Sequence, residues 1–406
     1  MSVVLNRLKY RNFWVTRLGA LKACMEFLGK TDSDAWLFGA TGHAFVLNVA
    51  PDGCSSGPTA WNCDMITNLA HNLGVSVNAV NSWRTEHDFA LKQKIAWENT
   101  KRALDKGLPC YGWELGIAEF YTICGYNDHG YLYKGIGTPT LQFTADMGVW
   151  EEIVREEDGP LLREAFAAQG ITLDGGVSFA PGGYGDIVIR CQGVEGEFCA
   201  FPMNGRVQIH DDYSRHSEGY KPWEELGNTP VGWLHAGWLE AGAASDDFTT
   251  VLEALEFAVE FAGNPSKWVM PGYKSGLPGY DNWLHAVEHA PEEADPEGLA
   301  YNGEVWAECR RYAGAFLDEA ADRIGGAAGV LLREAAGPYK EAAGELVRYR
   351  NLMPFFGRKP GMPTELRREL TDALVNARKA EEAGLAALKK AYLAMETAAS
   401  AGSRLP

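Results

Sequence analysis

The stretch Gly19–Val49 reads GALKACMEFLGKTDSDAWLFGATGHAFVLNV, and its pattern governs how the first half of the chain is interpreted. Cys24 stands at the front of a short amphipathic run, and Gly29 ends that run as a C-cap glycine does. We therefore predict a helix that begins near Cys24. Because the positive end of a helix favours thiolate over thiol, a cysteine in this position is a candidate nucleophile.

The rest of the stretch predicts two further elements. A second short helix is expected at 34–38, closed by Gly39, and the apolar run 44–49 is typical of a buried strand. Beyond the stretch, the spacing of apolar and capping residues predicts helices at 61–73, 89–104 and 151–169, a strand at 75–80, a helix that starts at Pro338 and a long last helix capped by Thr364.

Two segments of the chain carry a resemblance to a known family. The first is the Cys24 run, followed by Leu-Gly, Leu-Phe-Gly and a Gly-rich entry to a strand. The second comprises 107–113 (GLPCYGW) and 119–128 (EFYTICGYND). Together they resemble the N-terminal domain of butirosin biosynthesis protein H and its relatives, a branch of the papain-like cysteine peptidase fold.

The resemblance covers about a third of the chain and carries several implications. It implies a bacterial protein in which Cys24 performs acyl transfer or amide hydrolysis on a small amine or a peptide-like substrate. An acyl carrier protein is the macromolecular partner that such chemistry suggests. In the related peptidases, the second segment forms the paired strands that carry the catalytic His.

The fold class expected from these patterns is α+β, with a papain-like N-terminal half and an α-helical C-terminal half. The suggested division is a core at 1–136, an inserted subdomain at 137–220, a return to the core at 221–245 and a helical domain at 246–406. The helical half is interpreted as a lid, a homodimer surface or a support, and these alternatives stay open.

Composition narrows the classes of function. The 406-residue chain has a net charge of −17, which argues against a nucleic-acid partner. It has no apolar run long enough to span a membrane and no signal-peptide pattern, so we expect a cytoplasmic protein. The eight cysteines lack CxxC spacing and are expected to be free thiols. We predict no cofactor and no metal.

The catalytic His is where this sequence departs from the family pattern. The position that should hold it, counted back from Gly125-Tyr126, is occupied by Glu119, and no His occurs between Cys110 and Tyr121. The Asp expected near Gly135 is missing as well. His43, in a Gly-flanked loop, is therefore the first substitute for a general base, although a loop His bonded to backbone is the simpler interpretation.

Glu119 leads to the second function class. A carboxylate between apolar strands is costly unless it is paired, so it could bind a cationic amine, or simply reach solvent from an edge strand. The predicted catalytic set is Cys24, His43 and Glu119. The predicted substrate-binding residues are Trp61, Trp113, Glu114 and Tyr121. Two hypotheses remain, namely a cysteine-dependent acyltransferase or amide hydrolase, and an inactive papain-like protein that binds a small amine or peptide-like ligand.

Overall fold

The protein is described by a computed structural model that covers residues 2–138, 141–181, 186–194, 197–203, 205–211, 218–293, 295–356, 358 and 360–402. It is a mixed α+β protein, 51% helical and 19% strand, with a sheet-rich N-terminal region and a helical C-terminal region. The predicted fold class is confirmed at this level.

The chain divides into two units. Unit 1 contains residues 1–29 and 78–240, and unit 2 contains residues 30–77 and 241–406. The division suggested by the sequence kept 1–136 together as one core, whereas residues 30–77 here belong with the helical half. The stretch Gly19–Val49 is therefore shared between the two units.

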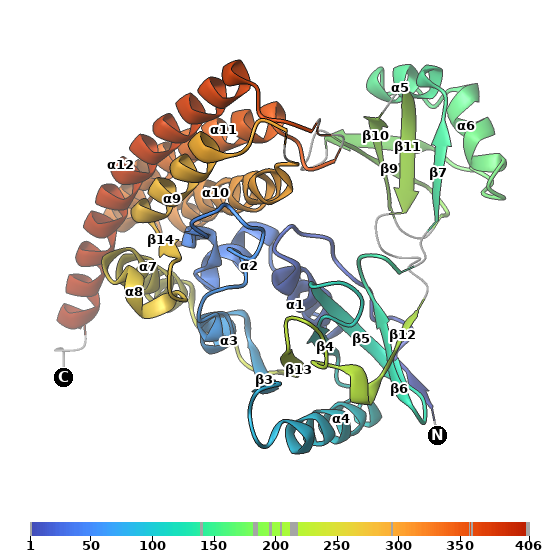
Figure 1. Ribbon diagram of the computed structural model, residues 1–406, viewed down its shortest axis with the longest axis horizontal. Coiled ribbons are helices and arrows are strands. Elements are labelled where there is room, and N and C mark those ends of the chain that lie inside the picture. The colour runs from blue at the N-terminus through green and yellow to red at the C-terminus, as the bar shows by residue number, and fades with distance from the viewer. Residues whose placement is uncertain are drawn as a thin grey trace. The chain divides into compact units, whose positions relative to one another are not determined.

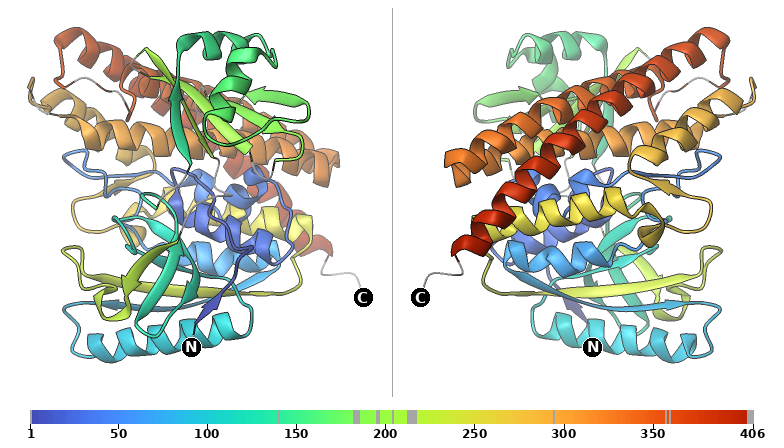
Figure 2. Two further views of the ribbon diagram at one scale, coloured as in Figure 1. Left: turned by 90° about the vertical axis from the view of Figure 1, so that its right-hand side faces the viewer. Right: turned by 90° about the vertical axis from the view of Figure 1, so that its left-hand side faces the viewer.

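The main sheet of unit 1 is built from antiparallel pairs in the order β12-β6-β5-β4-β13-β3, with β1 paired to β5 (Figure 1). Helix α1 packs on β4 and β5 from one face and α4 covers the opposite face (Figure 2). The elements are β1 (Val3–Val4), α1 (Thr16–Phe27), β3 (Val75–Trp83), α4 (Phe89–Asp105), β4 (Cys110–Trp113), β5 (Phe120–Tyr126), β6 (Gly130–Lys134), β12 (Gly219–Pro222), η3 (Trp223–Glu225) and β13 (Trp233–Ala241).

Side chains alternate between the two faces of this sheet, as a β-strand requires. The α4 face forms an apolar core that includes Trp97, Ile123 and Leu234. The face toward α1 carries Phe120 and His235 instead. Polar and aromatic side chains thus gather beside the start of α1, and this face holds the candidate site described below.

Residues 141–211 form a second antiparallel sheet, in the order β7-β11-β10-β9-β8. Two short helices pack on it around Phe166, Phe198 and Ile189, which are fully or almost fully buried. This part of unit 1 therefore has an apolar core of its own. Its elements are β7 (Gln142–Ala145), α5 (Met147–Val154), α6 (Pro160–Ala167), β8 (Val177–Pro181), β9 (Ile187–Cys191), β10 (Glu197–Met203) and β11 (Arg206–Asp211).

Unit 2 is dominated by long helices, and α12 runs along α11 and across α7 and α9 (Figure 2). Its elements are α2 (Asp34–Ala40), η1 (His43–Phe45), β2 (Asn48–Val49), α3 (Asp64–Asn68), η2 (Leu69–Leu73), α7 (Asp247–Gly263), α8 (Pro265–Trp268), β14 (Lys274–Ser275), α9 (Leu277–His289), α10 (Glu297–Ile324), α11 (Gly326–Leu352) and α12 (Thr364–Gly402).

Several local predictions for the first stretch need correction. Gly29 does follow the C-terminus of α1 with φ +80°, as expected. Gly39, however, lies inside α2 and does not end it. Glycine is needed there because a Cβ would come within 1.9 Å of the Phe316 ring. The strand predicted at 44–49 is also wrong. Its first two residues lie in η1, and only Asn48–Val49 pair, with β14.

A buried ion pair joins two of the helices in unit 2. The Nε of Arg310 in α10 donates to Glu381 of α12 at 2.5 Å, and its Nη1 donates to the carbonyls of Ala44 and Val46. Tyr280 of α9 donates to the same carboxylate at 3.3 Å. Both charged side chains are almost fully buried. Removing either one would leave the other as an unpaired buried charge, which is strongly destabilising.

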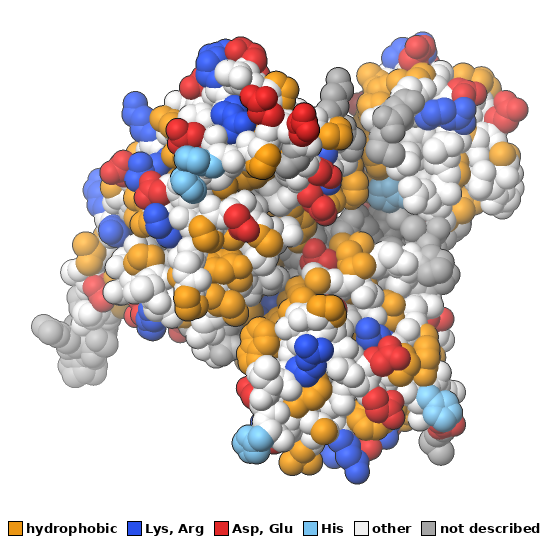
Figure 3. Space-filling view, viewed as in Figure 1, with side chains coloured by type: hydrophobic (Ala, Val, Ile, Leu, Met, Phe, Trp, Pro, Cys, Tyr) orange, Lys and Arg blue, Asp and Glu red, His pale blue; other side chains and the backbone are white. Residues whose placement is uncertain are grey.

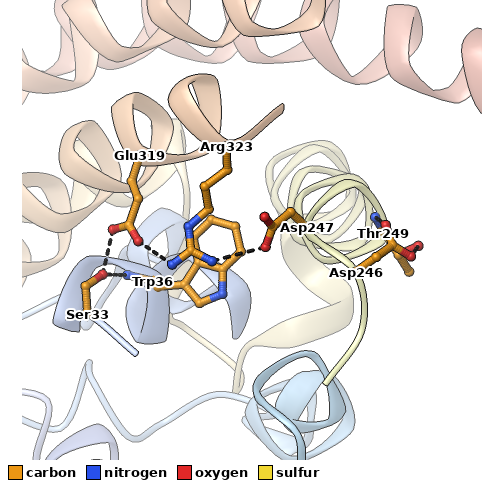
Figure 4. Close-up of polar contacts among 7 residues, drawn as sticks. All are labelled: Ser33, Trp36, Asp246, Asp247, Thr249, Glu319 and Arg323. Atoms are coloured by element: carbon orange, nitrogen blue, oxygen red, sulfur yellow. Dashed lines mark hydrogen bonds and ion pairs between the residues drawn. The ribbon is translucent and has the colours of Figure 1, made fainter. Parts of the chain in front are cut away.

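A second, more exposed cluster joins α2, α7 and α10 (Figure 4). The guanidinium of Arg323 lies 3.6 Å from the centre of the Trp36 ring and forms ion pairs with Glu319 and Asp247. Ser33 caps α2 by accepting from the Trp36 backbone N–H, and its hydroxyl donates to Glu319. The cluster ties the α2 segment to helices far away in sequence.

The surface over these helices is charged with both signs interspersed (Figure 3). Many of the charges form short-range pairs along one helix, such as Arg348 with Glu345 and Arg368 with Glu365. Pairs of this kind at exposed positions contribute only a few tenths of a kcal/mol each, about 0.2–0.5.

Candidate functional site

Cys24 does not occupy the position that its proposed chemistry needs. It is the ninth of the twelve residues of α1, so the prediction that it opens the helix is wrong. Its side chain is fully buried, and its Sγ donates to the carbonyl of Cys110 at 3.6 Å. Burial raises the pKa of the Cys24 thiol far above its ordinary value. The helix N-terminus therefore cannot supply the thiolate on which the nucleophile hypothesis rested.

His43, the proposed substitute base, belongs to unit 2, whereas Cys24 belongs to unit 1. It is buried in η1, and its Nδ1 lies 3.6 Å from the Sγ of Cys309. The Trp61 ring, one of the predicted substrate-binding groups, lies 5.7 Å from the His43 ring. His43 and Trp61 are thus brought together, inside the apolar core of unit 2.

Glu119, Glu114 and Trp113 are brought together where β4 turns into β5. The backbone N–H of Glu114 donates to the carbonyl of Glu119 at 2.8 Å. The Glu119 carboxylate accepts from the hydroxyl of Thr16 at 2.5 Å, and that hydroxyl in turn accepts from the backbone N–H of Phe120. Glu119 therefore fastens the first residue of α1 to the start of β5.

Glu114 has an unusual backbone for a residue with a side chain. Its φ is +57°, in the left-handed region, and its side chain is buried. Its carboxylate accepts from the hydroxyl of Thr229 at 2.6 Å, on the loop that leads into β13. Strain of this kind persists only where the surroundings enforce it and is concentrated at functional sites.

Tyr121 stands apart from this group. It follows Phe120 in β5 and so points to the opposite face, where it packs in the core beneath α4. Its hydroxyl accepts from the backbone N–H of Ile117, and burial raises its pKa. Of the predicted substrate-binding residues, Trp113 and Glu114 lie on or beside the α1 face, whereas Tyr121 does not.

The centre of the site is a histidine that the sequence analysis did not select. His235 lies in β13, and its Nδ1 is hydrogen-bonded to Oδ1 of Asn81 in β3 at 2.5 Å. The strand register sets Trp113 opposite His235, and Phe120 opposite Trp113. Asn81, His235, Trp113 and Phe120 thus form one row across four neighbouring strands, hereafter the His235 row.

The Asn81 bond defines the state of the imidazole. With Oδ1 of Asn81 as the acceptor, the proton of neutral His235 lies on Nδ1, and Nε2 presents a lone pair. Burial, and secondarily the positive charge of Arg17, lower the pKa of His235 well below its ordinary value. At pH 7 the ring is therefore neutral, and Nε2 is a hydrogen-bond acceptor.

Two buried polar atoms of the row have no hydrogen-bond partner among the described residues. They are Nε2 of His235 and Nε1 of Trp113, whose side chains are 1% and 3% exposed. Both rings contact Phe120 and Trp233, with ring centroids between 5.0 and 5.5 Å apart. Buried polar groups without partners are rare, so each of these two atoms requires an explanation.

The start of α1 supplies the charge beside this row. Arg17, the second residue of the helix, is 6% exposed, and its guanidinium lies 5.4 Å from the centre of the Phe120 ring. Its neighbour Thr16 bonds Glu119, as described above. The helix N-terminus therefore carries a hydroxyl and a guanidinium beside the oriented imidazole.

No model of a known protein family matches the chain, and no curated protein matches it. Within the described ranges, no group of three or more His, Cys, Asp or Glu side chains is arranged to hold a metal ion. In the same part of the chain, no helix combines the length and apolar character needed to cross a membrane.

His235 was missed because its signal is weak in one dimension. The segment Trp233–Trp238 reads as an alternating strand, and a single His within an apolar strand is an available clue. Its partner Asn81 lies 154 residues earlier, however, so no local spacing connects the two. Only the pairing of β3 with β13 brings them together.

Proposed function

We propose that unit 1 binds a peptide-like ligand through an amide group at the His235 row, without covalent catalysis. The observation that carries the proposal is the pair of unpartnered atoms, an acceptor on His235 and a donor on Trp113. A secondary amide offers one N–H and one C=O and can satisfy both. Pairing both atoms would remove the cost of leaving them buried and unbonded, about 1–3 kcal/mol each.

The charges favour an amide over an amine. Glu119, the residue that suggested an amine site, already accepts a hydrogen bond from Thr16. The guanidinium of Arg17 lies on the Phe120 ring of the same row, and its charge is felt at His235. An ammonium group entering the row would meet that positive charge, whereas a neutral amide would not.

The papain-like part of the resemblance is retained as a proposal. Papain-like chemistry requires a thiolate at a helix start, an imidazole beside it and a group that orients the imidazole. In unit 1, Asn81 orients the His235 imidazole, and both this ring and the guanidinium of Arg17, at the start of α1, lie 5.4 Å from the centre of the Phe120 ring. This arrangement supports a papain-like protein that lacks its nucleophile, the second of the two original hypotheses.

Entry of a ligand requires the row to open, and the loop before β13 offers a route. Gly227 and Gly232 bound this loop, both with φ above +70°. Between them, Thr229 is held by the Glu114 carboxylate and accepts from the Gly232 backbone N–H. The Arg84 backbone N–H also donates to the Gly232 carbonyl at the end of the loop. Release of Thr229 by Glu114 would free the middle of the loop while this end stays bonded to β3.

An amide hydrolase or acyltransferase is the second candidate, because an imidazole with a free Nε2 is also a general base. In that case Cys24 would be the nucleophile and would have to leave its buried position. An acyl carrier protein would then be the partner. The two candidates differ in outcome, since a hydrolase consumes the amide and a binding protein returns it unchanged.

The test is calorimetric titration of the whole protein with N-acetyl amino-acid amides and with simple alkylamines, followed by analysis of the recovered amide. We expect amide binding without turnover. His235→Phe removes the acceptor and keeps a ring, so it should weaken binding three- to tenfold or more while leaving the melting temperature unchanged or raised.

Trp113→Phe should weaken binding similarly. His129→Phe, at an exposed histidine of the same unit, is the matched control and should bind like the unmodified protein. Equal binding by His235→Phe would refute the site. Cleavage of the amide that is abolished by Cys24→Ser would establish the enzyme instead.

A further inference from the structure

A second row of aromatic side chains lies directly beside the His235 row. Trp83 comes two residues after Asn81, and Trp233 comes two residues before His235, so they share the face of that pair on β3 and β13. Their rings are stacked, with centroids 6.2 Å apart and an interplanar angle of 26°. Trp233 also contacts the rings of His235 and Trp113, so the ring contacts are continuous.

The outer member of this stack is exposed. Trp83 is 40% accessible, whereas the side chains of the His235 row are 1–3% accessible where they are aromatic. Tryptophan is a large apolar residue, and at the end of β3 a flat part of the Trp83 ring is left exposed to solvent. The surface continues from the buried row to the outside of unit 1.

We propose that Trp83 selects peptide-like ligands that carry an aromatic side chain next to the bound amide. The inference rests on the proposed amide site, because the amide at His235 and Trp113 fixes where the neighbouring side chain must go. An aromatic ring stacked on Trp83 extends the existing pair in the offset geometry that such rings prefer.

A cationic side chain is the main competitor, since an indole face also attracts cations. The next residue, Arg84, argues against it. Its backbone N–H bonds the Gly232 carbonyl, and its Nε would lie 3.7 Å from a Cβ at residue 232, directly before Trp233. Arg84 thus adds a positive charge next to Trp83 in the chain, which disfavours a cationic side chain at this place.

The experiment compares the affinities of three ligands, N-acetyl-phenylalaninamide, N-acetyl-leucinamide and N-acetyl-lysinamide, measured by calorimetry on the full chain. We expect the phenylalanine amide to bind about three- to tenfold more tightly than the leucine amide. Trp83→Ala should reduce this ratio to about one and leave the leucine amide unaffected, while Trp83→Phe should keep most of the preference.

Leu91→Ala, at an exposed apolar side chain of α4, is the matched control and should retain the full ratio. Equal binding of the phenylalanine and leucine amides by the unmodified protein would overturn the inference alone. Tighter binding of the lysine amide would do the same. If none of the three ligands binds, the proposed amide site itself has failed, so the two failures are distinguishable.

Discussion

Each unit buries a basic side chain among aromatic rings, and the two differ in how that side chain is satisfied. In unit 2, Arg310 has a charge partner in Glu381 and donates to two backbone carbonyls, although its Nη2 has no partner among the described residues. In the described part of unit 1, the His235 side chain has one hydrogen-bond partner, Asn81, and its Nε2 acceptor has none. A group that is nearly satisfied holds a fold together, whereas a pre-oriented and unsatisfied group is able to bind something else.

The largest expected effect is on the rate at which Cys24 is alkylated. A reactive Cys24 would make the cysteine, and not His235, the main functional group of unit 1. Iodoacetamide should label the exposed Cys54 in the native protein between pH 5 and 9. Labelling of Cys24 should be at least about a thousandfold slower, since it requires the buried thiol to be exposed by unfolding. Peptide mass spectrometry measures both rates in one sample.

Cys54→Ser is the control for that assignment and should remove the fast-labelled peptide. Rapid labelling of Cys24 below pH 8 would mean a thiolate held by a nearby positive group. The cysteine-dependent enzyme would then become the leading hypothesis for unit 1.

The next largest effect is on stability, and it tests whether the Arg310–Glu381 ion pair of unit 2 holds the fold together. Glu381→Leu leaves Arg310 buried without its charge partner and should reduce the free energy of unfolding by about 3–5 kcal/mol. Glu382→Leu, at the exposed neighbouring position, should change it by less than about 0.5 kcal/mol. Chemical denaturation measures both.

The double variant Arg310→Met with Glu381→Leu should recover much of the loss, because it removes the unpaired charge. A cost below about 1 kcal/mol for Glu381→Leu alone would contradict the assignment of this ion pair as a structural element. The comparison between the two units would then lose its basis.

A smaller effect is expected from Glu304 in unit 2. Burial raises its pKa to about 7, opposed by Arg350 at 3.8 Å and by the backbone N–H of Phe355. Between about pH 4.5 and 7, Glu304 is therefore protonated in the folded state and ionised in the unfolded state. The contribution of Glu304 to the free energy of unfolding should be fully present below pH 4.5 and should fall by about 1–3 kcal/mol as the pH rises through 7.

Glu304→Gln should flatten this part of the profile of unfolding free energy against pH. Glu341→Gln, at an exposed position of α11, should leave it unchanged. A profile that is equally steep in Glu304→Gln and in the unmodified protein would place the titrating group elsewhere.

The smallest expected effect is a difference in stability between glycine substitutions at two residues with positive φ. Glu156, after the end of α5, has φ +56°, and Glu114 has φ +57°. Glu156→Gly should stabilise the protein by about 1 kcal/mol, because glycine adopts this conformation without a Cβ clash. Glu114→Gly should give no such gain, since it also removes the bond to Thr229. Thermal denaturation of both variants measures the difference, and equal gains would mean that the Glu114 carboxylate contributes nothing.

The sequence predicted the regular elements well where apolar periodicity was strong. The helix expected at 89–104 is α4, the strand expected at 75–80 lies within β3, and α12 begins at Thr364. Predictions failed where a local break was misjudged. The helix expected at 151–169 is divided between α5 and α6 around Glu156.

The helix expected to start at Pro338 begins instead after Gly325, whose φ of +67° ends α10. Pro338 lies inside α11. The residue before it is Gly337, which has no Cβ to clash with the proline ring. Proline is thus tolerated where the sequence pattern predicted a helix start.

The candidate site was predictable only in its local part. Glu119, Trp113 and Glu114 were grouped correctly, because β4 and β5 are consecutive in the chain and pair directly. His43 was chosen for its closeness to Cys24 in sequence, and it belongs to the other unit. Closeness along the chain is a poor guide when residues 30–77 leave the unit that residues 1–29 belong to.

The sequence by itself determined the α+β class, the position of α4, the start of α12 and the acidic charge, because these depend on composition and on neighbours a few residues apart. Only the tertiary structure decided the order of the strands, and with it the meeting of His235 with Asn81 and Trp113. The tautomer of His235 and the burial of Cys24 follow from that order. Both are set by contacts between distant segments, and no local pattern encodes such contacts.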